Sequence, residues 1–218
     1  MSYNAIVFDL DGTLLDTLDD LANAMNRVLY ANGFPAHEVD AYRYFIGSGA
    51  LKHVTRALPE DSRDEETIEK CLQAFRADYI DSWHVKTKPY DGVTELFGEL
   101  ANRSIRMSVL SNKPDEFTKA CVEHYFAKWE FAAVTGPREG ILPKPDLSGV
   151  RETMRALGVP ADQTLYLGDT GVDMDTARGA GLKAIGALWG FRTEAELLEH
   201  GAEVLIRHPL GLLELLDG

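Results

Sequence analysis

The chain begins with a short apolar run that ends abruptly in acidic residues, in the sequence AIVFDLDGT at positions 5–13. Four consecutive apolar residues are typical of a strand that is buried on both faces of a parallel sheet. Asp9 then lies at the carboxyl end of this strand, which is the edge where open α/β sheets bind their ligands. Gly12 allows the chain to turn away at that edge without a clash from a side chain.

Asp9 and Asp11 are only two positions apart. Two carboxylates held this close repel each other unless a cation or a proton lies between them. The pair therefore favours a site for a hard divalent cation. The alternative is an ordinary turn, since Asp-Gly is a common turn dipeptide.

The rest of the chain shows two different patterns. Between residues 16 and 89 the apolar spacing is helical, and no strand-like run occurs. After residue 90 the patterns alternate: strands are predicted at 107–110, 131–134, 164–167, 184–188 and 204–206, and helices at 93–101, 116–127, 150–157 and 173–180. This alternation indicates a mostly parallel sheet. We therefore predict an α/β fold in which residues 1–15 and 90–218 form a doubly wound, Rossmann-like core and residues 16–89 form an inserted, all-helical cap domain.

Charge and cysteine content limit the classes of partner. The 218 residues carry a formal net charge of −13, which argues against nucleic acids and anionic membranes as main partners. No apolar segment approaches the ~20 residues that span a bilayer, and residues 1–4 do not resemble a signal peptide. Two cysteines, Cys71 and Cys121, are too few for a disulfide framework. We expect a cytoplasmic protein, either a monomer or a homodimer.

Polar residues also follow other predicted strands. Ser111 and Asn112 follow the strand at 107–110, Asp169 follows the strand at 164–167, and Lys144 lies in a loop between two prolines. Each has an ordinary explanation alone: a helix cap, a turn, or a solvated lysine. Because the carboxyl ends of parallel strands meet at one edge, we expect these residues to converge on one pocket.

The residue types in this pocket indicate phosphate chemistry. Oxygen ligands without histidine or cysteine suit Mg²⁺, which Asp9 and Asp169 can hold from two strands. Lys144 and the hydroxyl and amides near Ser111 can contact phosphate oxygens. Asp9 can attack phosphorus as the nucleophile, and Asp11 can serve as general acid and base. The metal and the lysine would offset the repulsion between carboxylate and phosphate.

Four motifs occur in order along the chain: DLDGTL at 9–14, SNKP at 111–114, PKP at 143–145 and GDTGVD at 168–173. With these motifs the chain resembles the haloacid dehalogenase-like superfamily, and within it the phosphoglycolate phosphatase group. The resemblance implies a Rossmann-like core, a helical cap and Mg²⁺-dependent hydrolysis of a small phosphorylated substrate. Carried onto this sequence, it assigns the following roles: Asp9 as nucleophile and metal ligand, Asp11 as acid/base with its main-chain carbonyl on the metal, Thr13 as an orienting or phosphate-contacting residue, Ser111 and Asn112 as phosphate ligands, Lys144 as the residue that steadies the phosphoryl group, and Asp169 and Asp173 as metal ligands.

The substrate remains open at this point. Gly47, Ser48 and Gly49 lie before a predicted helix in the insertion, where their N–H groups could favour a carboxylate such as that of 2-phosphoglycolate. A flexible loop explains the same residues equally well. The alternatives to a phosphatase for 2-phosphoglycolate are a phosphatase for another small phosphate ester, a phosphosugar mutase on the same scaffold, and a phosphate-binding or interaction protein without turnover. A dehalogenase is disfavoured by Asp11 and Asp169.

Overall fold

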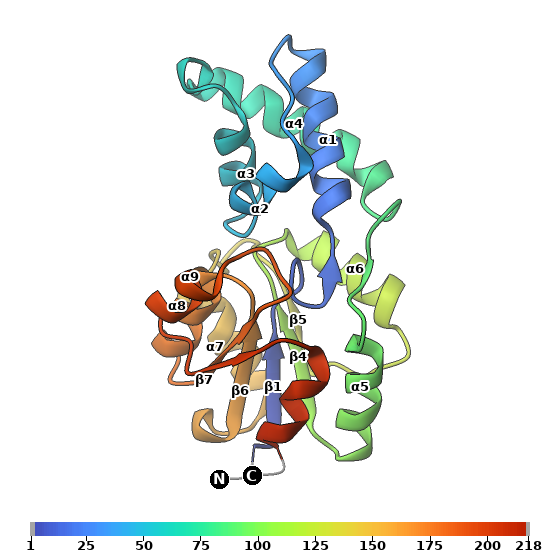
Figure 1. Ribbon diagram of the computed structural model, residues 1–218, viewed down its shortest axis with the longest axis vertical. Helices are drawn as coiled ribbons and strands as arrows, with labels where there is room; N and C mark the ends of the chain where they lie inside the picture. Colours follow the sequence, from blue (N-terminus) through green and yellow to red (C-terminus); the bar gives the residue numbers. More distant parts are fainter. Residues whose placement is uncertain (1–2, 217–218) are drawn as a thin grey trace. The chain divides into compact units, whose positions relative to one another are not determined.

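The computed structural model describes residues 3–216. The chain forms two compact units: one comprises the chain up to Leu15 and from Pro89 onward, and the other runs from Asp16 to Lys88. The first unit is an α/β core and the second is entirely helical apart from its ends (Figure 1). Two-residue strands, β2 (Leu15–Asp16) and β3 (Lys88–Pro89), pair where the chain passes from one unit to the other.

The core is built on one parallel sheet. Within the described residues its six strands run in the order β5-β4-β1-β6-β7-β8, and every neighbouring pair is parallel. The strands are β1 (Ala5–Phe8), β4 (Arg106–Leu110), β5 (Val134–Thr135), β6 (Thr164–Gly168), β7 (Lys183–Ala187) and β8 (Val204–Ile206). The chain places β4 and β5 on one side of β1 and then β6, β7 and β8 on the other side, as in doubly wound folds. The carboxyl ends of β1 and β6, between which the direction reverses, are therefore the expected ligand site. The predicted fold class is confirmed.

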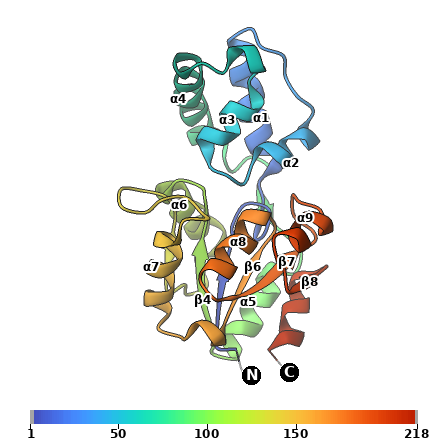
Figure 2. The same ribbon diagram turned by 90° about the vertical axis from the view of Figure 1, so that its left-hand side faces the viewer.

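Helices cover both faces of the sheet (Figures 1 and 2). Successive side chains of β1 point to opposite faces, so each face carries apolar residues that these helices bury. Ala5 and Val7 pack into one apolar cluster with α7 (Leu147–Leu157), α8 (Gly171–Gly179) and α9 (Glu194–Glu199). Phe8 points to the other face, where its ring meets that of Phe97 at 5.6 Å. That face holds α5 (Val93–Asn102) and α6 (Asp115–Phe126), whose Phe126 ring lies 5.1 Å from Phe97. Both faces of β1 are thus buried, as its apolar run predicts.

The helical unit contains α1 (Leu18–Ala31), α2 (Tyr42–Phe45), α3 (Ala50–Ala57) and α4 (Glu65–Ser82). Its core is rich in ring contacts, with Tyr42 at 5.6 Å from His53 and His53 at 4.9 Å from Phe75. Asp64 caps α4 by accepting a hydrogen bond from the Thr67 amide at 2.9 Å. None of the helices between residues 3 and 216 combines the length and the apolar character that a bilayer-crossing segment requires.

Several element boundaries differ from the sequence-based prediction. The strand predicted at 131–134 is displaced toward the C-terminus, since only Val134 and Thr135 form β5. The region predicted as all-helical begins with part of a strand, because β2 takes up Leu15 and Asp16 and α1 begins only at Leu18. Short helical turns complete the chain: η1 (Val39–Ala41), η2 (Glu60–Ser62), η3 (Ala161–Gln163) and η4 (Pro209–Leu215).

A buried carboxylate cluster as candidate active site

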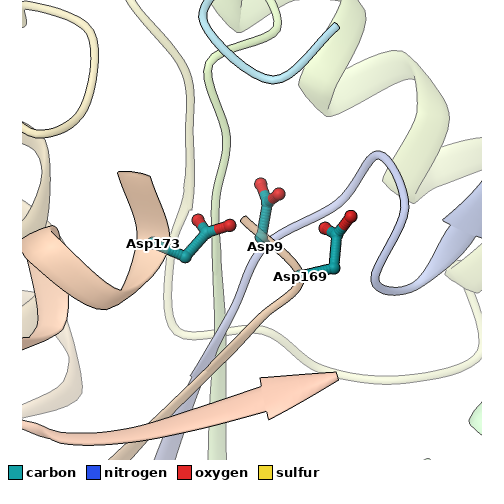
Figure 3. A group of neighbouring side chains, drawn as sticks. All are labelled: Asp9, Asp169 and Asp173. Carbon is teal, nitrogen blue, oxygen red and sulfur yellow. The ribbon is translucent and has the colours of Figure 1, made fainter. Parts of the chain in front are cut away.

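Three aspartates meet at the carboxyl edge of the central strands. Asp9 follows β1, Asp169 follows β6, and Asp173 lies in the first turn of α8. The backbone N–H of Asp9 donates to the Leu167 carbonyl at 2.9 Å, which keeps β1 and β6 in register up to the site. One carboxylate oxygen from each aspartate lies within 4.8 Å of the others, and all three side chains are buried (Figure 3).

The orientation of Asp173 follows from a capping box at the start of α8. The backbone N–H and the hydroxyl of Thr170 donate to Oδ2 of Asp173 at 3.0 Å and 2.7 Å. With Oδ2 fixed in the helix cap, Oδ1 faces the cluster and also accepts a hydrogen bond from the Tyr166 hydroxyl at 3.2 Å. A local helix-capping interaction therefore positions one of the three carboxylates.

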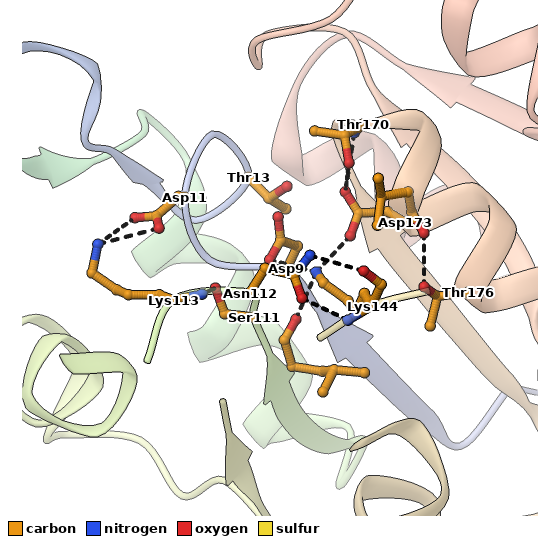
Figure 4. Close-up of polar contacts among 12 residues, drawn as sticks. Asp9, Asp11, Thr13, Ser111, Asn112, Lys113, Lys144, Thr170, Asp173 and Thr176 are labelled. Carbon is orange, nitrogen blue, oxygen red and sulfur yellow. Dashed lines mark hydrogen bonds and ion pairs between the residues drawn. The ribbon is translucent and has the colours of Figure 1, made fainter. Parts of the chain in front are cut away.

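Lys144 supplies the positive charge of the site (Figure 4). Its ammonium donates to Oδ1 of Asp9 at 2.8 Å, to Oδ1 of Asp173 at 2.7 Å and to the Leu110 carbonyl at 3.0 Å. The loop that carries Lys144 is held by the side-chain amide of Asn112. The Lys144 N–H donates to the Asn112 oxygen at 2.6 Å, and the Asn112 amide donates to the Lys144 carbonyl at 3.1 Å.

Thr13 and the segment after β7 hold Asp169. The Thr13 hydroxyl donates to Oδ1 of Asp169 at 2.8 Å, and the Phe191 amide donates to Oδ2 at 2.7 Å. Trp189 in turn donates its indole N–H to the Thr13 carbonyl at 2.9 Å. The backbone packs closely around this carboxylate: a Cβ on Gly12 would lie 2.4 Å from Oδ2 of Asp169. Gly12 also has a positive φ of 88°, so both its space and its conformation require glycine.

The electrostatics of the cluster are those of a cation site. When ionised, the three carboxylates exceed the charge of the Lys144 ammonium by two, and the charge of Arg192 lowers the pKa of Asp169 without overcoming the effect of burial. Burial, followed by the nearby charge of Asp173, raises the pKa of Asp9 well above its usual range and the pKa of Asp169 to about 7. Burial opposes the charge of Lys144, but the carboxylates of Asp173 and Asp9 prevail and raise its pKa.

This donor set fits a magnesium ion. All three candidate ligands are carboxylate oxygens, which Mg²⁺ prefers, and a divalent cation would supply the charge that the cluster lacks. Asp9, Asp169 and Asp173 are thus the residues whose side chains could hold the metal, and the predicted contribution of the Asp11 main-chain carbonyl stays a prediction. Without a cation, burial favours the protonated forms of Asp9 and Asp169, the two aspartates whose pKa it raises.

Asp11 and Ser111 lie on neighbouring loops of the same edge. The Asp11 carboxylate is not part of the three-aspartate group; it is paired with the Lys113 ammonium, at 3.0 Å and 3.2 Å from its two oxygens (Figure 4). The Ser111 hydroxyl accepts a hydrogen bond from the backbone N–H of Lys113 at 3.2 Å. Asp11 and Ser111 thus share Lys113 as a neighbour, while the other predicted core residues are joined by direct contacts or by the close approach of the three aspartates: Asp9, Thr13, Asn112, Lys144, Asp169 and Asp173.

The predicted residues of the insertion lie in the helical unit. Gly47, Ser48 and Gly49 connect α2 to α3, and Gly49 precedes the first residue of α3. The two glycines have positive φ angles of 102° and 88°, a conformation that explains why glycine stands at both positions. Their proposed contact with a substrate remains a prediction.

Some site residues were not predicted from the sequence. Lys113 belongs to a quoted motif, but no role was assigned to it, and its partner Asp11 is 102 positions away. The role of Thr170 in holding the predicted Asp173 is a case that local sequence could have identified, because a threonine three residues before an acid is the pattern of a capping box. Tyr166 and Trp189 carry no local signal for their contacts with the site.

Comparison with known proteins places this geometry in a family. The sequence model of the haloacid dehalogenase-like hydrolases matches residues 6–187. The chain is 32% identical over 210 residues to the phosphoglycolate phosphatase of Mesorhizobium japonicum, covering 95% of this chain and 92% of the relative. It is 30% identical over 212 residues to the phosphoglycolate phosphatase of Aquifex aeolicus, covering 97% and 96%.

Solved structures agree with the sequence comparison. A crystal structure of a protein from Lactobacillus delbrueckii subsp. bulgaricus superimposes with a TM-score of 0.93 at 33% identity and covers 99% of both chains. The family match spans the strands and loops that carry all three aspartates and Lys144. The resemblance inferred from the four motifs is confirmed, and the chain belongs to the haloacid dehalogenase-like hydrolase family, in which it is similar to the phosphoglycolate phosphatases.

Proposed function

We propose that the protein is a phosphatase that hydrolyses phosphate monoesters through a covalent aspartyl-phosphate on Asp9. The observation that carries this proposal is the buried cluster in which Lys144 bridges Asp9 and Asp173 while Asp169 lies within 4.8 Å. A carboxylate nucleophile must approach a dianionic phosphate, and it can do so only where positive charge offsets the repulsion. The cluster combines a fixed ammonium with a set of carboxylates suited to a divalent cation.

Asp9, Asp169 and Asp173 would hold Mg²⁺. When bound, the ion supplies charge compensation for phosphate oxygens and for the attacking carboxylate. Lys144 offsets the charge of the same phosphate and carboxylate oxygens, because its ammonium contacts Asp9. The hydrogen bond from the Lys144 backbone N–H to the Asn112 side chain holds the loop in place. Ser111 is proposed to contact the phosphate from the end of β4, and Asn112 to assist it while it positions the lysine.

The reaction would proceed in two steps. In the first, an Asp9 oxygen forms a bond to phosphorus as the ester P–O bond breaks, and Asp11 donates a proton to the departing alkoxide. In the second, Asp11 takes a proton from water as the water oxygen attacks phosphorus, which releases inorganic phosphate and restores Asp9. Thr13 keeps Asp169 oriented throughout by its hydrogen bond of 2.8 Å.

The proposed substrate is 2-phosphoglycolate. Relatives that cover most of this chain at 30–32% identity bear the name phosphoglycolate phosphatase. The predicted contact between the segment Gly47 to Gly49, which precedes α3, and a carboxylate of the substrate is part of this proposal. We further infer a cytoplasmic setting, which the free thiols of Cys71 and Cys121 support.

A phosphate-release assay tests the proposal. The purified protein with Mg²⁺ should liberate inorganic phosphate from 2-phosphoglycolate with a higher kcat/KM than from other small phosphate esters. Chelation of the metal should abolish turnover, and so should Asp9→Asn, which removes the nucleophile while preserving its shape.

Each alternative gives a different result in this assay. A mutase would convert a sugar phosphate to its isomer without net release of phosphate. A binding protein would release no phosphate from any ester although it is folded. Efficient hydrolysis of a different ester would leave the phosphatase chemistry intact and overturn only the choice of substrate.

A further inference from the structure

One ion pair at the site connects two loops that are far apart in the sequence. Lys113, which follows β4, extends its ammonium to both oxygens of Asp11, which follows β1, at 3.0 Å and 3.2 Å. Figure 4 shows the Asp11 side chain directed toward Lys113 rather than toward Lys144. The pair thus determines the direction of the carboxylate that the proposed function uses as acid and base.

The main chain of Lys113 is fixed on several sides. Its carbonyl accepts a hydrogen bond from the Thr118 hydroxyl at 2.8 Å, and its N–H donates to the Ser111 hydroxyl at 3.2 Å. Gly136 packs against the same carbonyl so closely that a Cβ there would lie 2.5 Å from it. The lysine therefore starts from a rigid point, and its ammonium has a defined location.

The loop that carries Asp11 is equally constrained. The Leu10 carbonyl accepts hydrogen bonds from the amides of Leu14 and Leu15 at 2.9 Å and 3.0 Å, and Gly12 donates to the Leu15 carbonyl at 2.8 Å. With both backbones fixed, the ion pair leaves the two side chains little freedom. The Lys113 side chain is 3% exposed and that of Asp11 is 12% exposed, so water competes weakly for either charge.

We propose that Lys113 is a positioning residue for the proton-transfer step, holding the Asp11 carboxyl group in the orientation from which it serves the departing oxygen. This inference rests on the proposed function. A proton from Asp11 matters most when the leaving group is a poor one, such as an alkoxide, because the breaking P–O bond leaves a strongly basic oxygen. An acidic phenol such as p-nitrophenol departs as the anion and needs no such proton.

This difference separates positioning from a purely structural role. If Lys113 only ties two loops together, its loss should slow the hydrolysis of all esters alike. If it positions the acid, its loss should penalise alkyl esters selectively. The ratio of kcat/KM between the two kinds of ester is the diagnostic quantity, since kcat/KM reports only the steps up to cleavage of the ester bond.

The experiment compares 2-phosphoglycolate, or the best alkyl phosphate of the panel, with p-nitrophenyl phosphate for the wild-type protein and Lys113→Met. We expect kcat/KM for the alkyl ester to fall by at least ~10-fold more than for p-nitrophenyl phosphate, within the range of general-acid effects. Asp11→Asn should show the same selective loss. The double variant should lose little more than either single variant, because the two residues act as one unit.

Lys119→Met is the matched control, since Lys119 is a lysine of α6 whose exposed side chain pairs with Asp115. Its ratio should equal that of the wild type. If Lys113→Met does not fold, Lys113→Arg is measured instead; it keeps the charge but moves it, and its ratio should fall several-fold.

Three outcomes are decisive. An unchanged ratio in a folded Lys113 variant, together with a selective loss in Asp11→Asn, overturns the role of Lys113 alone. An equal fall in kcat/KM for all esters also overturns the positioning role and indicates that the ion pair only stabilises the two loops. Absence of any phosphatase activity in the wild-type protein is instead a failure of the proposed function.

Discussion

At the scale of single residues, the site depends on a lysine whose ammonium contacts two carboxylates. Lys144 is buried, and burial of an ammonium is costly unless it is paired. The carboxylates of Asp9 and Asp173, at 2.8 Å and 2.7 Å, provide that pairing, and the ammonium in turn offsets part of their negative charge. The arrangement makes the site sensitive to neutral substitution of Lys144.

Lys144→Met should lower kcat for the preferred ester by ~10²-fold or more, since preorganised charged groups of this kind have effects of that size. Methionine fills the space of the lysine stem, so the loss reports the charge rather than a cavity. Steady-state kinetics with saturating Mg²⁺ measure the effect, and a thermal melt monitors the fold. A lower melting temperature with an unchanged kcat would show that Lys144 acts on stability alone.

Sequence patterns predicted individual residues where strand ends determine their position. The proximity of Asp9 and Asp169 could be predicted from the sequence because each follows a buried parallel strand. The direction of the Asp11 side chain could not be predicted, because it depends on the turn at Gly12 and on a lysine from a distant loop. Asp173 was carried over by family resemblance, although its capping box gives a local reason for its place.

At the scale of elements, Asp20 of α1 organises the end of the helical unit that returns to the core. Its carboxylate accepts hydrogen bonds from the amide of Lys86 at 2.9 Å, the amide of Thr87 at 2.8 Å and the Thr87 hydroxyl at 2.8 Å. The segment before β3 is thereby fastened to the first turn of α1. Asp20 is 3% exposed, so water does not easily replace these contacts.

Asp20→Ala should reduce the free energy of unfolding by about 3 kcal/mol, because it leaves buried donors without their acceptor. Urea unfolding followed by circular dichroism measures the change. Asp19→Ala is the matched control: Asp19 is adjacent in α1 and pairs with the Lys86 ammonium, but both side chains are largely exposed. It should change stability much less. Equal effects in the two variants would contradict the buried-acceptor explanation.

Elements with clear periodicity were predicted well, and short ones were not. The run at 5–8 and the strand at 164–167 match β1 and β6 nearly residue for residue, because buried strands leave a continuous apolar signal. β2 and β3 have two residues each, too few for any period to show. In the apolar stretch from 131 to 134, only Val134 is part of a strand, since pairing with β4 rather than composition decides where β5 begins.

At the scale of the whole molecule, the buried cluster couples stability to pH and to metal. Burial, with the charge of Asp173, raises the pKa of Asp169 to about 7, whereas an unfolded aspartate titrates near 3.9. Between these two values the native protein binds more protons than the unfolded chain. The metal-free protein should therefore lose stability as pH rises from about 4 to about 7; the contribution of Asp169 is fully present only below pH ~4 and is lost above pH ~7.

Metal binding should reverse this trend. A cation needs deprotonated carboxylates, so protons compete with Mg²⁺ less as pH rises through 7. Because Mg²⁺ binds the native state, the stabilisation that it gives grows with its affinity. We expect the addition of Mg²⁺, at a concentration on the order of 10 mM, to raise the melting temperature by several degrees more at pH 8 than at pH 6.

The origin of this pH dependence can be isolated by substitution. Asp169→Asn should weaken the response to Mg²⁺ and flatten its pH dependence, because it removes both a ligand and the group that titrates near 7. Asp162→Asn, at an exposed aspartate just before β6, should leave both unchanged. Differential scanning fluorimetry at the two pH values, with and without chelator, measures all three proteins. A Mg²⁺ shift of equal size at both pH values in the wild type would show that the cluster does not exchange protons for metal, and the divalent-cation site would then have to lie elsewhere.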